Sequence, residues 1–196
     1  TADSLGVKVL DHIVITRHLF LINANVKEGF RIVSGFTPSV LGQTGIETKD
    51  VIVSLINTVK PKFAIAIDSL ASSSIDRINK TIQITDTGIV PGAGVNNARK
   101  EISINTLGIP VIAIGIPTVV DLATITNDCI NIFIENLQQK AMSNSTLNEL
   151  KEKDNYEEIK EALIPKDYNM IVTPKEIDKL IDNMSEIVAR GINKSL

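Results

Sequence analysis

The chain has 196 residues, 43% of them hydrophobic and 22% charged, and its 20 Lys and Arg against 23 Asp and Glu give a net charge of −3, which is typical of one globular domain with or without an appendage. A single cysteine, Cys129, excludes an intrachain disulfide. The sequence has no Cys and His clusters for structural zinc and no basic clusters for nucleic-acid binding. It also has no 18-residue apolar run that would cross a membrane and no secretory signal for export. We therefore expect a soluble protein in a reducing, cytoplasmic compartment, with no nucleic acid and no membrane among its partners.

Short β-branched runs alternate with helical patterns along the first two thirds of the chain. The expected strands are residues 13–15, 31–33, 63–67, 81–84 and 111–114. The runs 63–67 and 111–114 are apolar without alternation and predict adjacent or near-adjacent central strands covered on both faces, whereas 81–84 alternates and is expected nearer an edge.

Helices are expected between several of these strands. Apolar residues at helical spacing predict a helix over 48–59, which Pro61 stops, and a second helix over 118–140 that should cover one face of the sheet. The alternation of strands and helices predicts an α/β fold, a three-layer α/β/α sandwich of the phosphorylase/hydrolase-like kind with a mostly parallel or mixed central sheet.

The acidic excess lies in the last part of the chain. Residues 1–142 hold 12 basic and 12 acidic side chains, whereas 143–196 hold 8 and 11. We interpret 1–142 as a catalytic α/β/α core that lacks an N-terminal segment, and 143–165 as an acidic polar connector, a solvated helix or mobile segment that is the least ordered part of the chain. Residues 166–196 should then carry a C-terminal amphipathic helix that docks on the core.

This last helix has a start signal in Thr173-Pro174-Lys175-Glu176. Thr173 as N-cap, Pro174 at the first position and Glu176 at the third form the pattern of a capping box. The pattern predicts a helix from there to about residue 192.

Two aspartates are candidates for catalysis. Asp68 directly follows the run 63–67, and a polar residue at the carboxyl end of a central strand is where ligands gather in α/β sheets, although such a carboxylate also caps turns. Asp3 begins an amphipathic turn and is by itself an N-cap candidate. As a pair, one carboxyl could activate water and the other protonate the leaving amine, which requires the two to lie within about 10 Å and one of them to stay protonated near neutral pH.

Two glycine-rich segments, 35–45 and 88–97, match no phosphate-binding loop and are interpreted as substrate-cleft loops or ordinary turns. Asp86-Thr87-Gly88 spells the D-T-G signature of pepsin-like and retroviral aspartic proteases. Those enzymes are all-β and need two such carboxylates, so we interpret this single copy as a turn.

His12 and His18 are the only histidines, and no serine lies in a G-x-S-x-G elbow. They are therefore expected to be surface or strand-flanking residues. Thr1 fits an N-terminal nucleophile whose own amine is the base, and it equally fits a boundary within a longer chain.

Longer strings of residues point to one known family. They are residues 1–6, 16–19, 42–48, 66–72, 79–89, 91–95 and 107–121. Through these strings most of residues 1–128 resembles the germination proteases of spore-forming bacteria, atypical aspartic endopeptidases that degrade the small acid-soluble proteins coating spore DNA.

The resemblance implies a function and a site. The two catalytic aspartates of the family fall on Asp3 and Asp68, with Asp68 as the water-activating base and Asp3 as the partner acid, or with the roles exchanged. It further implies small acid-soluble spore proteins as substrates, a homo-oligomer, the spore core as location, a zymogen form, and neither cofactor nor metal.

Alternatives remain at this stage. The family is similar in fold to hydrogenase-maturation endopeptidases, three-layer α/β/α proteins in which the matching acidic positions bind a metal together with a later histidine, whereas this chain has no histidine after His18. A metal-dependent endopeptidase of that type and a non-catalytic fragment or assembly module with the same fold are the two alternatives. Ala2 and Val7 stand where the family usually has proline, and family chains begin before the first catalytic aspartate, so Asp3 could be displaced here.

Overall fold

The computed structural model describes residues 1–22, 29–39, 41–95, 99–140, 156–163 and 170–196. The α-helices in these ranges are α1 (Leu5–Asp11), α2 (Arg17–Ile22), α3 (Leu41–Thr44), α4 (Thr48–Val59), α5 (Ile104–Leu107), α6 (Leu122–Lys140), α8 (Tyr156–Leu163) and α9 (Ile177–Ser195). The strands and 3₁₀ turns are β1 (Ala64–Ser72), η1 (Ile75–Arg77), β2 (Gln83–Thr85), η2 (Ala93–Val95), β3 (Val111–Asp121) and β4 (Ile171–Val172).

The strands form one mixed sheet in the order β1-β3-β2, with β4 added to β3. β1 and β3 are parallel neighbours, as the apolar runs predict, in a register that pairs Ala64 with Val111 and Asp68 with Gly115 and shifts between Leu70 and Ala71. β2 and β4 are antiparallel to β3. The mixed sheet with helices confirms the α/β prediction, and β2 lies at an edge of the described sheet, as its alternating sequence indicates. β1 lies at the opposite edge of the described sheet, so of the two strands predicted to be central only β3 has a neighbour on both sides.

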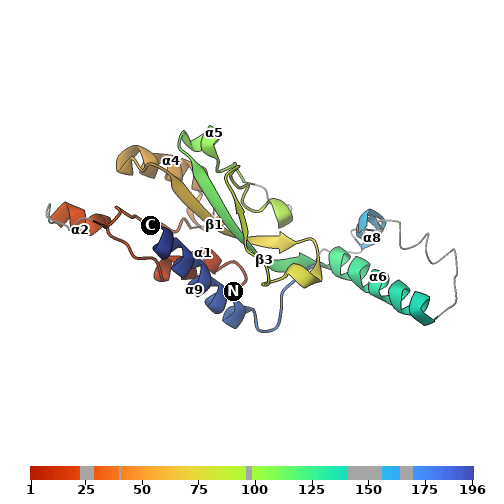
Figure 1. Cartoon of the computed structure of the whole chain (residues 1–196). Coiled ribbons are helices and arrows are strands. Elements are labelled where there is room, and N and C mark those ends of the chain that lie inside the picture. Colours follow the sequence, from red (N-terminus) through yellow and green to blue (C-terminus); the bar gives the residue numbers. More distant parts are fainter. Residues whose placement is uncertain (23–28, 40, 96–98, 141–155, 164–169) are drawn as a thin grey trace.

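Alternate side chains of β1 and β3 enter two different apolar clusters. Ile65, Ile67, Ile114 and Ile116 pack with α1 and α9 on one face. Ala66 and Val111 pack with α4 and the segment around α5 on the opposite face. Figure 1 shows the resulting three layers, with α1 and α9 side by side below the sheet and α4 and α5 above it.

The predicted helix over 118–140 is wrong at its start and in its position. β3 continues to Asp121 because Thr118, Val119 and Val120 are β-branched, and α6 begins only at Leu122. α6 then extends away from the end of the sheet with α8 beside it (Figure 1). It therefore covers neither face.

The predicted strands at 13–15 and 31–33 are also wrong. Asn193 of α9 takes the place of a strand partner, since its side chain accepts a hydrogen bond from Val14 N at 3.0 Å and donates one to His12 O at 2.9 Å. The second segment is held by Val33 O, which accepts from Thr16 N and Arg17 N. These contacts fix irregular backbone without a ladder.

The C-terminal helix α9 packs against α1, and Lys8 of α1 forms an ion pair with Asp182. The side chains that α9 buries are Ile177, Ile181, Ser185, Val188, Ala189 and Ile192. The predicted capping box is wrong: the helix begins at Ile177 with Glu176 as N-cap, because the Thr173 hydroxyl donates instead to Thr118 O at 3.0 Å.

Of the predicted connector 143–165, residues 156–163 form α8, and the rest lies outside the described residues. The division into core, connector and docking helix therefore stays a prediction. Within the described parts of the chain, no helix is long and apolar enough to cross a bilayer.

Candidate active site

Asp68 lies within β1 and not at its end, because the strand continues to Ser72. The expectation that Asp68 ends the strand is therefore wrong by four residues. Its side chain is half-buried, and its Oδ1 accepts a hydrogen bond from the backbone N–H of Ser69 at 2.9 Å. The carboxyl is thus held in one orientation next to the sheet.

The segment around Asp3 packs against the same part of β1. The hydroxyl of Ser69 donates a hydrogen bond to the carbonyl oxygen of Ala2 at 2.8 Å. Four residues after Ala2, Gly6 lies so close to the strand that a Cβ there would be 3.1 Å from the carbonyl oxygen of Ile67. Asp3 lies between these two contacts, exposed to solvent and one residue before the N-cap Ser4, so it is not itself the cap of α1.

The electrostatics of Asp68 reflect this arrangement. Removal from water raises the pKa of Asp68 above its usual value of 3.8, the Ser69 N–H hydrogen bond opposes this shift, and the negative charge of Asp3 raises the pKa further. The two carboxyls therefore interact across a sequence separation of 65 residues. Two interacting carboxyls of which one readily keeps its proton can supply an acid and a base to a single reaction.

Ser69 is the residue of this arrangement that reasoning from candidate chemistry did not single out. It follows Asp68 directly in the string Ala66 to Ser72, but a serine in a strand has no distinctive signal of its own. Its role becomes visible only when Ala2 is placed against it.

The remaining candidate residues lie apart from this arrangement. His12 and His18 are exposed. Asp86 is exposed in a turn after β2, in which Thr87 N donates to the Thr85 hydroxyl at 3.1 Å and Gly88 has φ 97°. The turn interpretation of the D-T-G string therefore agrees with the structure.

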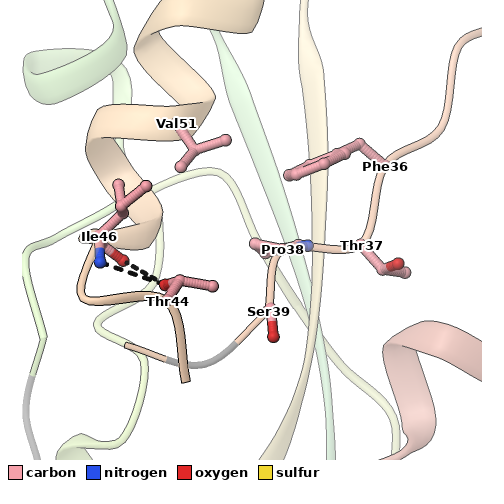
Figure 2. Close-up of a pocket in the computed structure, with 7 residues that line it drawn as sticks. All are labelled: Phe36, Thr37, Pro38, Ser39, Thr44, Ile46 and Val51. Carbon is pink, nitrogen blue, oxygen red and sulfur yellow. Dashed lines mark hydrogen bonds between the residues drawn. The ribbon is translucent and has the colours of Figure 1, made fainter. Parts of the chain in front are cut away.

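The first glycine-rich segment lines an open pocket of about 250 Å³ between residues 36–39 and the start of α4. Figure 2 shows Phe36, Pro38 and Val51 around the apolar side of this pocket, and the Thr44 hydroxyl bonded to Ile46 N at 3.1 Å. Neither Asp3 nor Asp68 is among its lining residues.

No three His, Cys, Asp or Glu side chains within the described residues come together in a way that could hold a metal ion. The carboxyl pair Asp3 and Asp68 on its own offers fewer ligands than the sites proteins build for zinc or nickel.

Comparison with known proteins gives consistent results. A sequence model of the germination protease family matches residues 1–146 and 133–196. Three similar proteins are each named germination protease: that of Bacillus licheniformis is 43% identical, that of Priestia megaterium 44% and that of Bacillus subtilis 40%. Each match covers 100% of this chain and 63% of the relative, so the chain spans less than two thirds of the length of these proteins.

The relatives also carry residues that this chain lacks within the matched region. The alignments run over 231 or 232 residues, more than the 196 of this chain. The two parts of the family match overlap over residues 133–146, which begin within α6.

Proposed function

Because the chain belongs to the germination protease family, we propose that it is an endopeptidase that cleaves small acid-soluble spore proteins in the spore core during germination. The proposed catalytic groups are the carboxyls of Asp3 and Asp68, acting without a cofactor. A homo-oligomer and a zymogen form belong to the same proposal, since both come from the family resemblance.

The observation that carries the site assignment is the hydrogen bond between Ser69 and Ala2. It ties the residue after Asp68 to the residue before Asp3, although the two segments are far apart in sequence. The raised pKa of Asp68, to which Asp3 contributes, supports the same pairing.

The two carboxyls divide the work of peptide hydrolysis. An ionised carboxylate removes a proton from water, the resulting hydroxide equivalent attacks the scissile carbonyl carbon, and a protonated carboxyl gives its proton to the leaving amide nitrogen. Burial favours the protonated form of Asp68, so the structure favours Asp68 as acid and the exposed Asp3 as base. This is the exchanged form of the assignment from sequence. When the C–N bond has broken, the base carries the proton taken from water and the acid has lost its own. Transfer of that proton from the base to the acid returns the pair to its starting state.

The test is cleavage of a purified small acid-soluble spore protein by the full chain and by its Asp68→Asn and Asp3→Asn variants. Loss of either group should lower kcat/KM by at least about 100-fold, the usual contribution of general acid–base catalysis. Asp11→Asn, at the exposed end of α1, is the matched control and should cleave like the parent chain.

If the parent chain cleaves the substrate and both variants cleave it equally well, the proposed catalytic pair is wrong. Loss of cleavage by the parent chain when a chelator is added would support the metal-dependent alternative. Absence of cleavage by the parent chain would overturn its proposed activity as an endopeptidase and leave a non-catalytic module.

A further inference from the structure

A small cavity lies on the sheet face that carries Asp68. It is open and has a volume of about 180 Å³. Its floor is formed by Ala113 and Gly115 of β3, and its rim by Gln83 and Thr85 of β2 on one side and Leu70 of β1 on the other. The second glycine-rich segment closes it with Gly88 and Ile89.

The register of the sheet connects this cavity to Asp68. Gly115 pairs with Asp68 on one side and with Gln83 on the other, so the three residues form one row across the sheet. Paired residues on neighbouring strands lie about 5 Å apart and point to the same face. The floor of the cavity therefore begins one strand away from the proposed catalytic carboxyl.

Gly115 leaves room for the Leu70 side chain at the edge of this cavity. A Cβ at this position would lie 2.4 Å from Cδ1 and 2.7 Å from Cγ of Leu70, so the Leu70 side chain lies directly over the glycine. Leu70 therefore forms the wall of the cavity towards β1. Ala113, two residues before Gly115 on the same face of β3, adds only a methyl group to the floor. This small residue, in the next row of the same face, keeps the rest of the floor open for a side chain that comes from elsewhere.

The lining determines which side chain fits. No charged residue lines the cavity, and Ala113, Gly115, Leu70 and Ile89 make it largely apolar. A charged group placed there would lose its hydration without gaining a partner, which is costly. An apolar cavity of roughly 150 Å³ holds a benzene-sized group, so this one has room for one branched aliphatic side chain.

We propose that this cavity is a subsite that receives one compact, uncharged side chain of the substrate peptide next to the scissile bond. The inference rests on the proposed function for the identity of the reacting groups. It assigns Gln83, at the open rim, as a residue that determines specificity: the amide can bond to the substrate backbone or to a side-chain hydroxyl, and it adds no charge.

The test uses a charge placed at the rim. The parent chain, a Gln83→Lys variant and an Ile84→Lys variant are compared on peptides from a small acid-soluble spore protein that carry Leu, Glu or Lys at each position flanking the scissile bond. Ile84 is the matched control, because it is 67% exposed on the same strand and its partner Ile114 faces the opposite layer. Both variants carry the same added charge at exposed positions, and thermal melts confirm that both are folded.

At one flanking position the parent chain should prefer Leu over Glu and Lys. There, Gln83→Lys should raise the ratio of kcat/KM for the Glu peptide to that for the Lys peptide by at least about tenfold, because the new cation attracts one and repels the other. Ile84→Lys should leave this ratio within about twofold. An equal change in both variants, or no change at any position in Gln83→Lys, would overturn the subsite.

A second arm separates this inference from the proposed function. The same peptides are titrated, by fluorescence anisotropy, into Asp68→Asn chains that carry either lysine substitution, so that affinity is measured without cleavage. Selective binding that only Gln83→Lys shifts, together with no cleavage by the parent chain, would support the subsite and overturn the protease proposal. Cleavage with unshifted selectivity would overturn the subsite alone, and absence of both binding and cleavage would overturn both.

Discussion

Asp68 is held in a position that disfavours its charge. Its folded-state pKa is raised above 3.8 by burial and by the charge of Asp3. Between the unfolded value and the higher folded value, the folded state binds the proton more tightly than the unfolded state, so the free energy of unfolding falls as pH rises through this window. Above the window the loss is complete, and below about pH 3.8 it is absent because both states are protonated.

We therefore expect Asp68→Asn to raise the melting temperature at pH 7 and the gain to shrink as the pH is lowered towards 4. The amide oxygen can still accept from Ser69 N–H, so the change removes the charge and keeps the hydrogen bond. Thermal melts followed by circular dichroism from pH 4 to 8 give the difference at each pH. Asp86→Asn, at an exposed turn, is the control, and a gain in Asp68→Asn that is the same at every pH would contradict the electrostatic explanation.

Sequence reasoning found the two aspartates by different routes. The apolar run before Asp68 predicts its strand from the residues alone, whereas Asp3 has only the signal of an ordinary helix cap, and the family resemblance strengthened its pairing with Asp68. The bond from Ser69 to Ala2 spans 67 residues. No local pattern predicts a contact over that separation, because it depends on how α1 is placed against the sheet.

At the scale of single elements, α9 contributes to the core through one face. Ile181 is 0% exposed and belongs to the cluster that includes Ile65, Ile67 and α1, whereas Ile187 on the same helix is 54% exposed. Ile181 and Ile187 are the same residue type on the same helix and differ in burial. Comparing their alanine variants therefore isolates the contribution of packing to the free energy of unfolding.

Ile181→Ala should lower the free energy of unfolding by about 2–5 kcal/mol, and Ile187→Ala should change it by less than about 0.5 kcal/mol. Urea denaturation at pH 7 measures both. Equal losses in the two variants would show that α9 does not dock on the sheet through the described face.

Elements with a strong apolar pattern were predicted well, and those that depend on a distant partner were not. The helix over 48–59 coincides with α4, the run 63–67 lies in β1 except for its first residue, and the run 111–114 lies in β3. The errors fall where tertiary contacts override local preference: Asn193 binds the backbone of 12–14 in place of a strand, and Thr173 bonds to Thr118 and not to its own helix. Strand ends were also missed, because the β-branched residues Thr118, Val119 and Val120 continue β3 into a region with helical spacing.

On the scale of the whole molecule, one sheet connects two apolar clusters. The cluster with α1 and α9 and the cluster with α4 and α5 lie on opposite faces of β1 and β3. Loss of packing on one face therefore exposes strands that the other face needs, and we infer that these layers unfold together. α6 has a different environment: among its described side chains only Ala123, Thr124 and Ile134 are buried, whereas Ile132 and Phe133 are 56% and 63% exposed.

This difference predicts two levels of stability in native-state hydrogen exchange. Amides in the second half of α6 should exchange at least about tenfold faster than those in the middle of α9, because local opening there exposes little apolar surface. Ile181→Ala should then accelerate exchange in β1, β3 and α9 together, since their amides report opening of the shared core, and should leave the second half of α6 unchanged.

Exchange measured at several protein concentrations also tests the proposed homo-oligomer, because a contact between copies at α6 would protect the α6 amides more as the protein concentration rises. Equal protection of α6 and α9 at the lowest concentration would contradict the division into a cooperative sheet core and a projecting helix.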